Sequence, residues 1–228
     1  MMFSGALTDE ERRLILSAPA PAVAVDSFHL RRLIDVVVSL SLIVLLAPVL
    51  LAIALLVVMT SPGNPIFAHK RVGQGGKTFP CLKFRSMHVD AEQRLKDLLA
   101  SAPELREEWR RCHKLTNDPR VSRIGNLLRV TSFDELPQLF NVLAGQMTLV
   151  GPRPIVADEL KHYGRFAGHY MTVKPGLTGL WQITGRSSVT YRRRVAADVL
   201  YIRSRSYLLD FRILVKTVPA ILFRRGAW

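Results

Sequence analysis

The chain has 228 residues, enough for one domain of good size with a substantial hydrophobic core. Its 32 Lys and Arg against 18 Asp and Glu give a formal net charge of +14, so we expect an anionic partner: nucleic acid, an anionic lipid surface or a phosphorylated substrate. The hydrophobic fraction of 49% argues against nucleic acid and favours the other two. The two cysteines, Cys81 and Cys112, lack metal-type spacing, which indicates free thiols in a reducing compartment.

Residues 1–28 are a mixed polar and Ala/Pro segment that we expect to be a mobile N-terminal leader. They lack the charged, apolar and cleavage regions of a secretory signal in the required order.

From Val36 to Met59 runs the longest apolar stretch of the chain, without a charged residue and long enough for a membrane helix. Pro48 lies near its middle and predicts a bend or break, because proline removes a backbone hydrogen bond. Basic residues flank the stretch on both sides, at 31–32 and 69–71, whereas a spanning helix usually has its positive charge on one side. Equal flanks fit a re-entrant helix, but the residues alone leave spanning and re-entrant helices as equal alternatives. Asp35 is expected to pair with the basic flank before it.

The next segment predicts a small β element. Ile66 to His69 and the glycine-rich stretch from Arg71 to Lys77 indicate a strand and a hairpin turn. A phosphate-cradling loop is the weaker alternative, because the glycine spacing does not match and no helix clearly follows. Thr78 to Arg85 alternates like a half-buried strand and is expected to place Lys83 and Arg85 on one face, as solvated cations or as phosphate ligands.

Asp90 to His113 is a charged helical stretch broken near Pro103, which predicts a surface helix pair packed on the domain. A turn is expected from Asn117 to Arg120, and the segment from Arg123 to Val130 leads into an acidic pair.

That pair, Asp134 and Glu135, is predicted to lie at the start of a helix that ends near Gly145. Ser132 or the residue before it is expected to cap this helix. The free N–H groups of a helix start can keep a carboxylate ionised and also receive a phosphate. The alternative is a capping box, in which Glu135 only reaches back to the Ser132 amide.

Met147 to Val150 predicts a short buried strand, and Gly151-Pro-Arg-Pro154 predicts a rigid turn that presents Arg153. Two carboxylates with a fixed guanidinium nearby suit phosphoryl chemistry with a divalent metal.

Ala157 to Tyr170 predicts a helix. The stretch from Lys174 to Arg186 is interrupted by proline and glycines and predicts a surface loop that presents Trp181 and Gln182. Such a loop would suit a nucleotide base or a sugar; an irregular structural linker is the alternative.

The C-terminal part predicts two helices. Tyr191 to Ser204 indicates a basic helix that carries Asp198. Tyr207 to Arg225 is amphipathic and basic, as interfacial membrane helices are.

Four motifs together resemble those of the bacterial sugar transferases, the monotopic polyprenyl-phosphate phosphoglycosyl transferases that begin exopolysaccharide, O-antigen and glycoprotein glycan assembly. The motifs are Lys83-Phe-Arg-Ser-Met87, Ser132-Phe-Asp-Glu-Leu-Pro-Gln-Leu-Phe-Asn-Val142, Gly151-Pro-Arg-Pro154 and Lys174-Pro-Gly-Leu-Thr-Gly-Leu-Trp-Gln-Ile-Thr-Gly-Arg186. The resemblance extends from about Arg31 to the C-terminus. Within the family the chain resembles most the short exopolysaccharide-initiating galactosyl- and glucosyl-phosphate transferases, which lack extra spanning helices.

The resemblance implies transfer of a sugar 1-phosphate from a UDP-sugar, UDP-galactose or UDP-glucose, to undecaprenyl phosphate, with release of UMP. It implies that Asp134 is the nucleophile of a covalent aspartyl-phosphosugar intermediate. Glu135, together with Asp134, is implied to hold Mg²⁺, with Mn²⁺ as an alternative. Basic family positions near the phosphates match Lys83, Arg129 and Arg153. Weaker candidates for substrate binding are Arg85, Arg186 and Asp198.

The resemblance also implies the architecture: a mixed α/β, mostly helical fold with an N-terminal re-entrant membrane helix, a small β element and interfacial amphipathic helices. The membrane helix would span residues 29–61 and break at Pro48. The family breaks this helix at a Ser-Pro or similar motif, whereas this chain has Ala47 before the proline. Residues 62–228 would form a cytoplasmic catalytic domain with a membrane-surface C-terminal helix, at the cytoplasmic face of the bacterial inner membrane.

The expected partners are the UDP-sugar, undecaprenyl phosphate and anionic membrane lipids, and a homodimer would be unsurprising. Nucleic acid is not expected, because the basic residues are spread over several elements and no nucleic-acid motif is present. Two alternatives remain: a membrane-associated basic binding or regulatory protein, and the same transfer by direct attack in a ternary complex, with Asp134 only a metal ligand.

Overall fold

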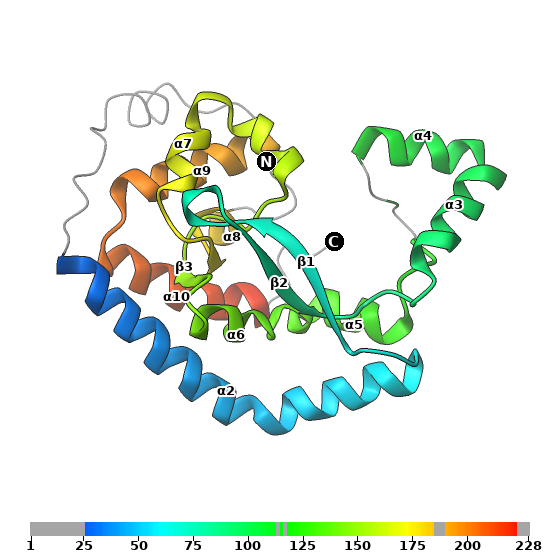
Figure 1. The fold of residues 1–228 in the computed structure, drawn as a ribbon, viewed down its shortest axis with the longest axis horizontal. Helices are drawn as coiled ribbons and strands as arrows, with labels where there is room; N and C mark the ends of the chain where they lie inside the picture. Colours follow the sequence, from blue (N-terminus) through cyan, green and yellow to red (C-terminus); the bar gives the residue numbers. More distant parts are fainter. Residues whose placement is uncertain (1–25, 113–114, 116–117, 185–189, 223–228) are drawn as a thin grey trace.

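The structure, a computed structural model, describes residues 26–112, 115, 118–184 and 190–222 (Figure 1). The predicted leader lies outside these residues up to position 25, and residues 26–28 already belong to the first helix. One candidate site residue, Arg186, also lies outside the described residues.

Within the described residues the fold is mostly helical with two small two-stranded sheets, which confirms the predicted mixed α/β, mostly helical composition. The elements of the first half are α2 (Asp26–Thr60), β1 (Ile66–Val72), η1 (Gln74–Gly76), β2 (Thr78–Phe84), α3 (Ala91–Ser101), α4 (Pro103–Cys112), α5 (Arg123–Thr131), η2 (Phe133–Glu135) and α6 (Gln138–Leu143). Those of the second half are β3 (Thr148–Val150), η3 (Ala157–Phe166), α7 (Ala167–Met171), β4 (Gly176–Thr178), α8 (Leu180–Thr184), α9 (Tyr191–Ser204) and α10 (Tyr207–Leu222).

The glycine-rich stretch forms the predicted hairpin turn. Strands β1 and β2 pair antiparallel, with Ile66 opposite Phe84 and Val72 opposite Thr78. The turn between them needs positive φ angles at Gly75 and Gly76, which glycine adopts at low cost. The predicted strand before the Gly-Pro-Arg-Pro turn is β3, which pairs parallel with β4.

The largest buried cluster holds the strands and the helices around them together. It joins β2, α6, β3, α9 and α10, and residues of α2 pack against it. Its buried members are Phe79, Cys81, Leu139, Val142, Met147, Leu149, Val150, Val173, Tyr201, Ile202 and Ile213. The N-terminal half of α2 is therefore part of the domain's packing as well as the chain's most apolar segment.

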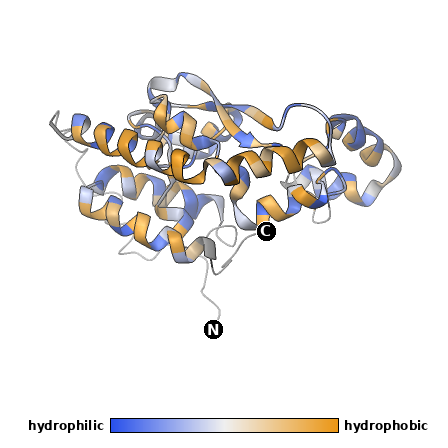
Figure 2. Ribbon diagram, turned by 90° about the horizontal axis from the view of Figure 1, so that it is seen from below, coloured by the Kyte–Doolittle hydropathy of each residue, from blue (hydrophilic) through white to orange (hydrophobic). Residues whose placement is uncertain are grey.

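The helix α2 is continuous through Pro48 and bends near its middle in Figure 1, so of the predicted bend or break the bend is found and the break is not. Proline removes one backbone hydrogen bond, but both halves of α2 pack against the domain, which holds the helical turns on either side. Among the described residues one helix, over His29–Thr60, is long and apolar enough to cross a membrane, and only 11% of its apolar window is buried. Figure 2 shows apolar residues along most of its length.

Polar side chains near the start of α2 bind α6 and β3. Arg32 donates to the carbonyls of Val142 and Leu143, at the C-terminal end of α6, both at 2.6 Å. Asp35 does not pair with the basic flank as predicted; it accepts hydrogen bonds from the Leu149 amide at 2.9 Å and from the hydroxyl of the residue before it. These bonds satisfy helix-end carbonyls and a buried carboxylate at the same time.

The remaining helices follow the predictions with two differences. The helix pair α3 and α4 forms as predicted, but in Figure 1 it extends away from the main body instead of packing on it. The predicted helix from Ala157 to Tyr170 is instead the 3₁₀ segment η3 followed by α7. Gly164, with φ of 49°, breaks the helical conformation between them. Helices α9 and α10 form where predicted.

We predict that Gly125→Ala displaces α5 and with it the neighbouring acidic turn. An added Cβ at Gly125 would lie 1.8 Å from the Ser86 carbonyl oxygen, so the backbones must separate. Overpacking of this kind costs about 2–3 kcal/mol and should lower the midpoint of thermal unfolding by roughly 5–10 °C.

The matched control is Gly168→Ala in α7, where an added Cβ would meet no atom within 4 Å. It should leave the midpoint unchanged or raise it slightly. Equal midpoints for the two variants would show that close packing at Gly125 does not matter.

Candidate active site

The acidic pair lies in a 3₁₀ turn between two helices, which corrects the predicted placement in the first turn of one helix. Ser132 adopts the left-handed conformation, with φ of 60°, and ends α5; Asp134 and Glu135 follow in η2, and α6 begins only at Gln138. The Ser132 side chain caps neither segment, so the capping box does not form. Gly145 has a positive φ after α6, as predicted.

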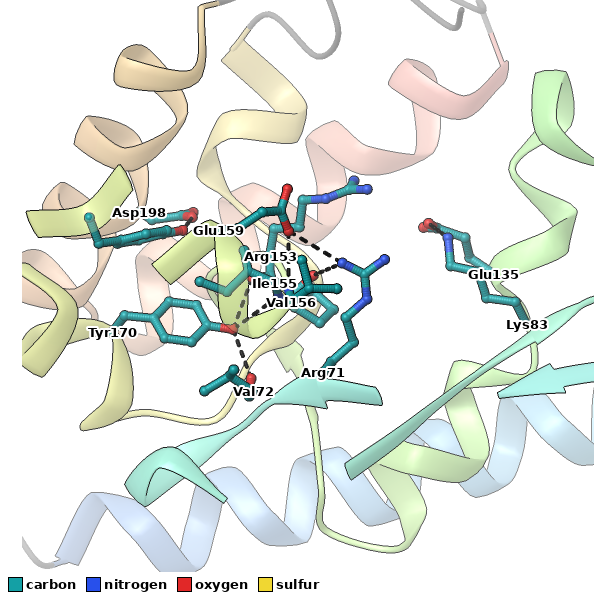
Figure 3. Close-up of polar contacts among 12 residues, drawn as sticks. Arg71, Val72, Lys83, Glu135, Arg153, Ile155, Val156, Glu159, Tyr170 and Asp198 are labelled. Carbon is teal, nitrogen blue, oxygen red and sulfur yellow. Dashed lines mark hydrogen bonds and ion pairs between the residues drawn. The ribbon is translucent and has the colours of Figure 1, made fainter. Parts of the chain in front are cut away.

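Lys83 binds both carboxylates of the pair from the neighbouring strand β2. Its Nζ atom lies 2.6 Å from Oε1 of Glu135 and 3.7 Å from Oδ2 of Asp134. The contact with Glu135 is drawn in Figure 3. The side chain of Asp134 is only 12% exposed and that of Glu135 26%. The ammonium therefore sits between two largely buried carboxylates.

The two carboxylates differ in their ionisation. Burial raises the pKa of Asp134 to about 6, although the charges of Lys83 and Arg129 oppose this shift and Glu135 adds to it. Burial also acts to raise the pKa of Glu135, but Lys83 and Arg153 outweigh it and hold that pKa below its usual value. Glu135 is therefore a permanent anion, while Asp134 is ionised at neutral pH and becomes protonated near pH 6.

A small pocket opens beside Glu135, and three of the side chains that line it are cationic. Its lining residues are Arg71, Cys81, Lys83, Glu135, Gln138, Arg153, Pro154, Leu177 and Gln182. Two arginines, one lysine and two planar amides around a carboxylate can bind a diphosphate with hydroxyl-bearing groups on either side.

Arg153 lines the pocket, as the Gly-Pro-Arg-Pro turn predicts. Its guanidinium carbon lies 5.3 Å from the centre of the Trp181 ring, a cation–π contact. Its backbone carbonyl accepts a hydrogen bond from the Tyr170 hydroxyl, which also contacts the Val72 carbonyl and accepts from the Ile155 amide (Figure 3). Tyr170 thus fastens the turn to the end of β1.

Arg71 is a pocket residue that the sequence reasoning missed. It stands at the end of β1, where its Nη1 atom is 3.4 Å from Oε2 of Glu159 and 3.4 Å from the Pro154 carbonyl. Figure 3 shows its guanidinium between Glu159 and Glu135. In the sequence Arg71 is recognisable only as part of a basic flank. The strand pairing that directs its side chain to the pocket forms only in the folded protein.

The segment around Trp181 is ordered and partly buried, so the predicted surface loop with an exposed aromatic plate is wrong. It forms β4 and α8, and Trp181 is 6% exposed. Its ring is covered by Arg153 and by Arg194, whose guanidinium carbon lies 5.1 Å from the ring centre. Trp181 therefore supports the cations, and Gln182 next to it lines the pocket as the planar amide.

The other two predicted basic residues within the described part of the chain, Arg129 and Arg85, lie in different places: one near the acidic pair and one away from it. Arg129 donates from Nε to the Ser86 hydroxyl at 2.9 Å, and its charge lowers the pKa of Asp134, so it lies near the site. Arg85 does not share the Lys83 face, because β2 ends at Phe84. It donates instead to the Ser61 carbonyl just after α2. Arg85 therefore binds the end of the long helix, not the pocket.

Asp198 is buried and does not line the pocket. Its side chain accepts a 2.7 Å hydrogen bond from the Tyr163 hydroxyl, and the residue is 1% exposed. Burial raises the pKa of Asp198 to about 7, against the opposing effects of the Tyr163 hydrogen bond and the positive charge of Arg153. In Figure 3 Asp198 lies to the left of Arg153, on the side away from Glu135 and Lys83.

The acidic pair fits a divalent cation such as Mg²⁺. Carboxylate oxygens are the ligands that Mg²⁺ prefers, and the Lys83 ammonium within 4 Å of both shows that the space between them accepts a cation. Among the described residues, no group of three or more His, Cys, Asp and Glu side chains is placed to hold a metal. Asp134 and Glu135 would therefore hold the ion together with substrate oxygens and water.

Comparison with known proteins yields one family model, described as bacterial sugar transferase, that matches residues 26–224. The chain is 48% identical over 204 residues to the undecaprenyl-phosphate galactose phosphotransferase of Salmonella typhimurium. It is 44% identical over 198 residues to the exopolysaccharide production protein ExoY of Sinorhizobium fredii, and 39% identical over 219 residues to the UDP-glucose:undecaprenyl-phosphate glucose-1-phosphate transferase of Caulobacter vibrioides.

These alignments cover 89%, 87% and 92% of this chain, respectively. They cover 42% of the Salmonella protein, 88% of the Sinorhizobium protein and 75% of the Caulobacter protein. The chain thus spans about two-fifths of the length of the Salmonella relative.

We predict that Asp198→Asn flattens the dependence of stability on pH. The unfolded Asp198 has a pKa near 4 and the folded one about 7, so the folded state binds the proton more tightly. Stability should therefore fall as the pH rises between these values, by about 1.4 kcal/mol per pH unit. An asparagine still accepts the Tyr163 hydrogen bond but carries no charge.

The measurement is the thermal unfolding midpoint of both proteins at pH 5, 6, 7 and 8. The midpoint of the wild type should fall relative to that of the variant up to about pH 7. Parallel curves would show that Asp198 does not take up a proton on folding.

Proposed function

The chain belongs to the bacterial sugar transferase family, and from this membership we propose that it transfers a sugar 1-phosphate from a UDP-sugar to undecaprenyl phosphate and releases UMP. UDP-galactose is the first donor we propose and UDP-glucose the second, as the first membrane step of exopolysaccharide synthesis. The observation that carries the proposal is the buried acidic pair beside a pocket with cationic walls.

In the proposed reaction the donor's diphosphate binds among Arg71, Arg153 and Lys83. These side chains line one pocket and offer two guanidinium forks and an ammonium to phosphate oxygens. A carboxylate oxygen of Asp134 then attacks the phosphorus next to the sugar. A new bond forms between this oxygen and phosphorus, and the bond from that phosphorus to UMP breaks, so UMP leaves with the electron pair.

The environment of Asp134 suits a nucleophile. Its pKa of about 6 leaves it ionised at neutral pH, and its burial removes the water that would otherwise solvate the anion. Bound Mg²⁺, held by Asp134 and Glu135, would supply positive charge that neutralises the diphosphate and the leaving UMP. The cationic wall supplies the same kind of stabilisation from the protein.

The second half of the proposed reaction restores the enzyme. A phosphate oxygen of undecaprenyl phosphate attacks the same phosphorus, and the bond to Asp134 breaks. The products are the undecaprenyl diphosphate sugar and the free carboxylate, so the charges and atoms balance over the two steps.

The experiment measures UMP release by the purified protein with Mg²⁺ and a panel of UDP-sugars, without lipid acceptor, followed by intact-protein mass spectrometry. We expect one equivalent of UMP and one hexose-phosphate adduct. Asp134→Asn should give neither, because an amide cannot act as the nucleophile. Asp97→Asn in α3, at an exposed position, is the matched control and should behave as the wild type.

The outcomes separate the mechanisms. UMP that appears only when undecaprenyl phosphate is added would keep the transfer but replace the covalent step by direct attack in a ternary complex. No UMP with any UDP-sugar, with or without acceptor, would contradict the proposed function.

We also propose that α2 enters and leaves the same leaflet, which places the catalytic domain at the cytoplasmic face of the inner membrane. The helix has 35 residues, a length of about 52 Å, against a hydrocarbon core of about 30 Å. Its start binds α6 and β3 through Arg32 and Asp35, while its end packs on the domain through Ile53 and Val57. A straight spanning helix would keep only one end beside the domain.

Cysteine accessibility tests this topology. In a variant without Cys112, single cysteines replace His29, at the start of α2, and Lys70, after its end; the remaining Cys81 is buried. A membrane-impermeant maleimide should label both positions in inside-out vesicles and neither in intact spheroplasts. Labelling of the two positions from opposite sides would show a spanning helix.

A further inference from the structure

We propose that Lys83 controls the access of the divalent cation to the acidic pair. In the donor-free protein its ammonium occupies the cation position between Asp134 and Glu135, and it leaves this position for the diphosphate of the donor. The inference rests on the proposed function, which supplies the diphosphate, and it adds an order of binding: the metal binds the pair tightly only once the donor is present.

The ammonium of Lys83 and a metal ion would compete for the same place beside the acidic pair. Nζ of Lys83 lies 2.6 Å from Oε1 of Glu135 and 3.7 Å from Oδ2 of Asp134. A Mg²⁺ or Mn²⁺ ion bound to the same two carboxylates would sit about 2.1 Å from an oxygen, within a few ångströms of the ammonium. Like charges this close in a largely buried site repel strongly, so the two cations compete for one place.

The neighbouring cations of the pocket are held by other protein groups, whereas Lys83 is held by the acidic pair. Arg71 is held by Glu159 and the Pro154 carbonyl, and Arg153 lies against Trp181. Within the described part of the chain, the ion pairs and hydrogen bonds of the Lys83 side chain all go to the acidic pair. Lys83 is thus the pocket cation that is bound to the acidic pair itself, and its departure would uncover these two carboxylates.

The side chain of Lys83 can make this exchange. It is a compact charge at the end of four flexible methylene groups, 25% exposed, and its backbone is fixed by pairing with Phe67 in the hairpin. It already lines the pocket that Arg71 and Arg153 also line. A diphosphate bound there would attract the ammonium by its negative charge and uncover the carboxylates for the divalent ion.

This assignment predicts opposite effects on metal binding and on activity. Removing the ammonium should strengthen metal binding to the donor-free protein, because a competing cation is gone. The same change should weaken the transfer, because a diphosphate ligand is gone. A residue that only stabilised the fold, or one that only helped to bind the metal, would not strengthen metal binding when removed.

The experiment is a Mn²⁺ titration of the purified full-length protein in detergent, with free Mn²⁺ measured by electron paramagnetic resonance. Lys83→Met keeps the length of the side chain and loses its charge. It should bind Mn²⁺ without nucleotide at least about tenfold more tightly than the wild type. Lys70→Met, at an exposed position of β1, removes the same charge from the surface and should leave the affinity unchanged.

Two further measurements test whether the Mn²⁺ ion binds at the acidic pair and whether a diphosphate displaces Lys83. Adding Glu135→Gln to Lys83→Met should abolish the gain, which would place the ion at the acidic pair. Adding UDP to the wild type should strengthen Mn²⁺ binding beyond that of UDP alone, measured without protein, while Lys83→Met should gain less from UDP.

The inference is overturned if Lys83→Met binds Mn²⁺ no more tightly than the wild type, including the case in which neither protein binds it. It is also overturned if the wild type binds equally well with and without UDP. Failure of the proposed function has a different signature, because the wild type would then release no UMP with any UDP-sugar whatever the Mn²⁺ result.

Discussion

The structure depends on keeping two adjacent carboxylates largely buried in one short turn. Two anions side by side in a poorly solvated place are costly unless cations face them, and several elements supply these cations. Lys83 comes from β2, Arg129 from α5 and Arg153 from the turn after β3. The order of elements along the chain serves to bring these separated charges to one turn.

The two arginines of the pocket, Arg71 and Arg153, are held in turn by a second set of contacts that reach into the core. Glu159 and Trp181 hold the guanidiniums of the pocket, and Tyr170 fixes the backbone of the turn that carries one of them. At the far end of α6, Arg32 binds the last carbonyls of the helix that follows the acidic turn. The apolar helix and the acidic turn are thereby joined through one short helix.

The sequence predicted the features that depend on local patterns. The acidic pair, the hairpin and the turn presenting Arg153 follow from neighbouring residues, and all three are where expected. The helix start at the pair was predicted wrongly, because the left-handed Ser132 divides the segment into two helices. Arg71 and the burial of Trp181 were missed for a different reason: both depend on which strands and helices pack together, and spacing along one segment carries no signal of that.

The acidic turn has an exposed apolar side chain next to a buried carboxylate, and its 3₁₀ form can direct the two to different sides. Successive side chains of a 3₁₀ helix point about 120° apart, so neighbours in η2 face different directions. Phe133 is 41% exposed, whereas Asp134 beside it is buried at 9%. The helices before and after this turn also expose apolar side chains, Leu127 and Phe140, and both helices contact α2. On the proposed membrane arrangement, the turn can place an aromatic ring among lipids while Glu135 lines a polar pocket and Asp134 lies buried beside it. A lipid-borne phosphate would then reach the nucleophile across a single residue, without leaving the membrane surface.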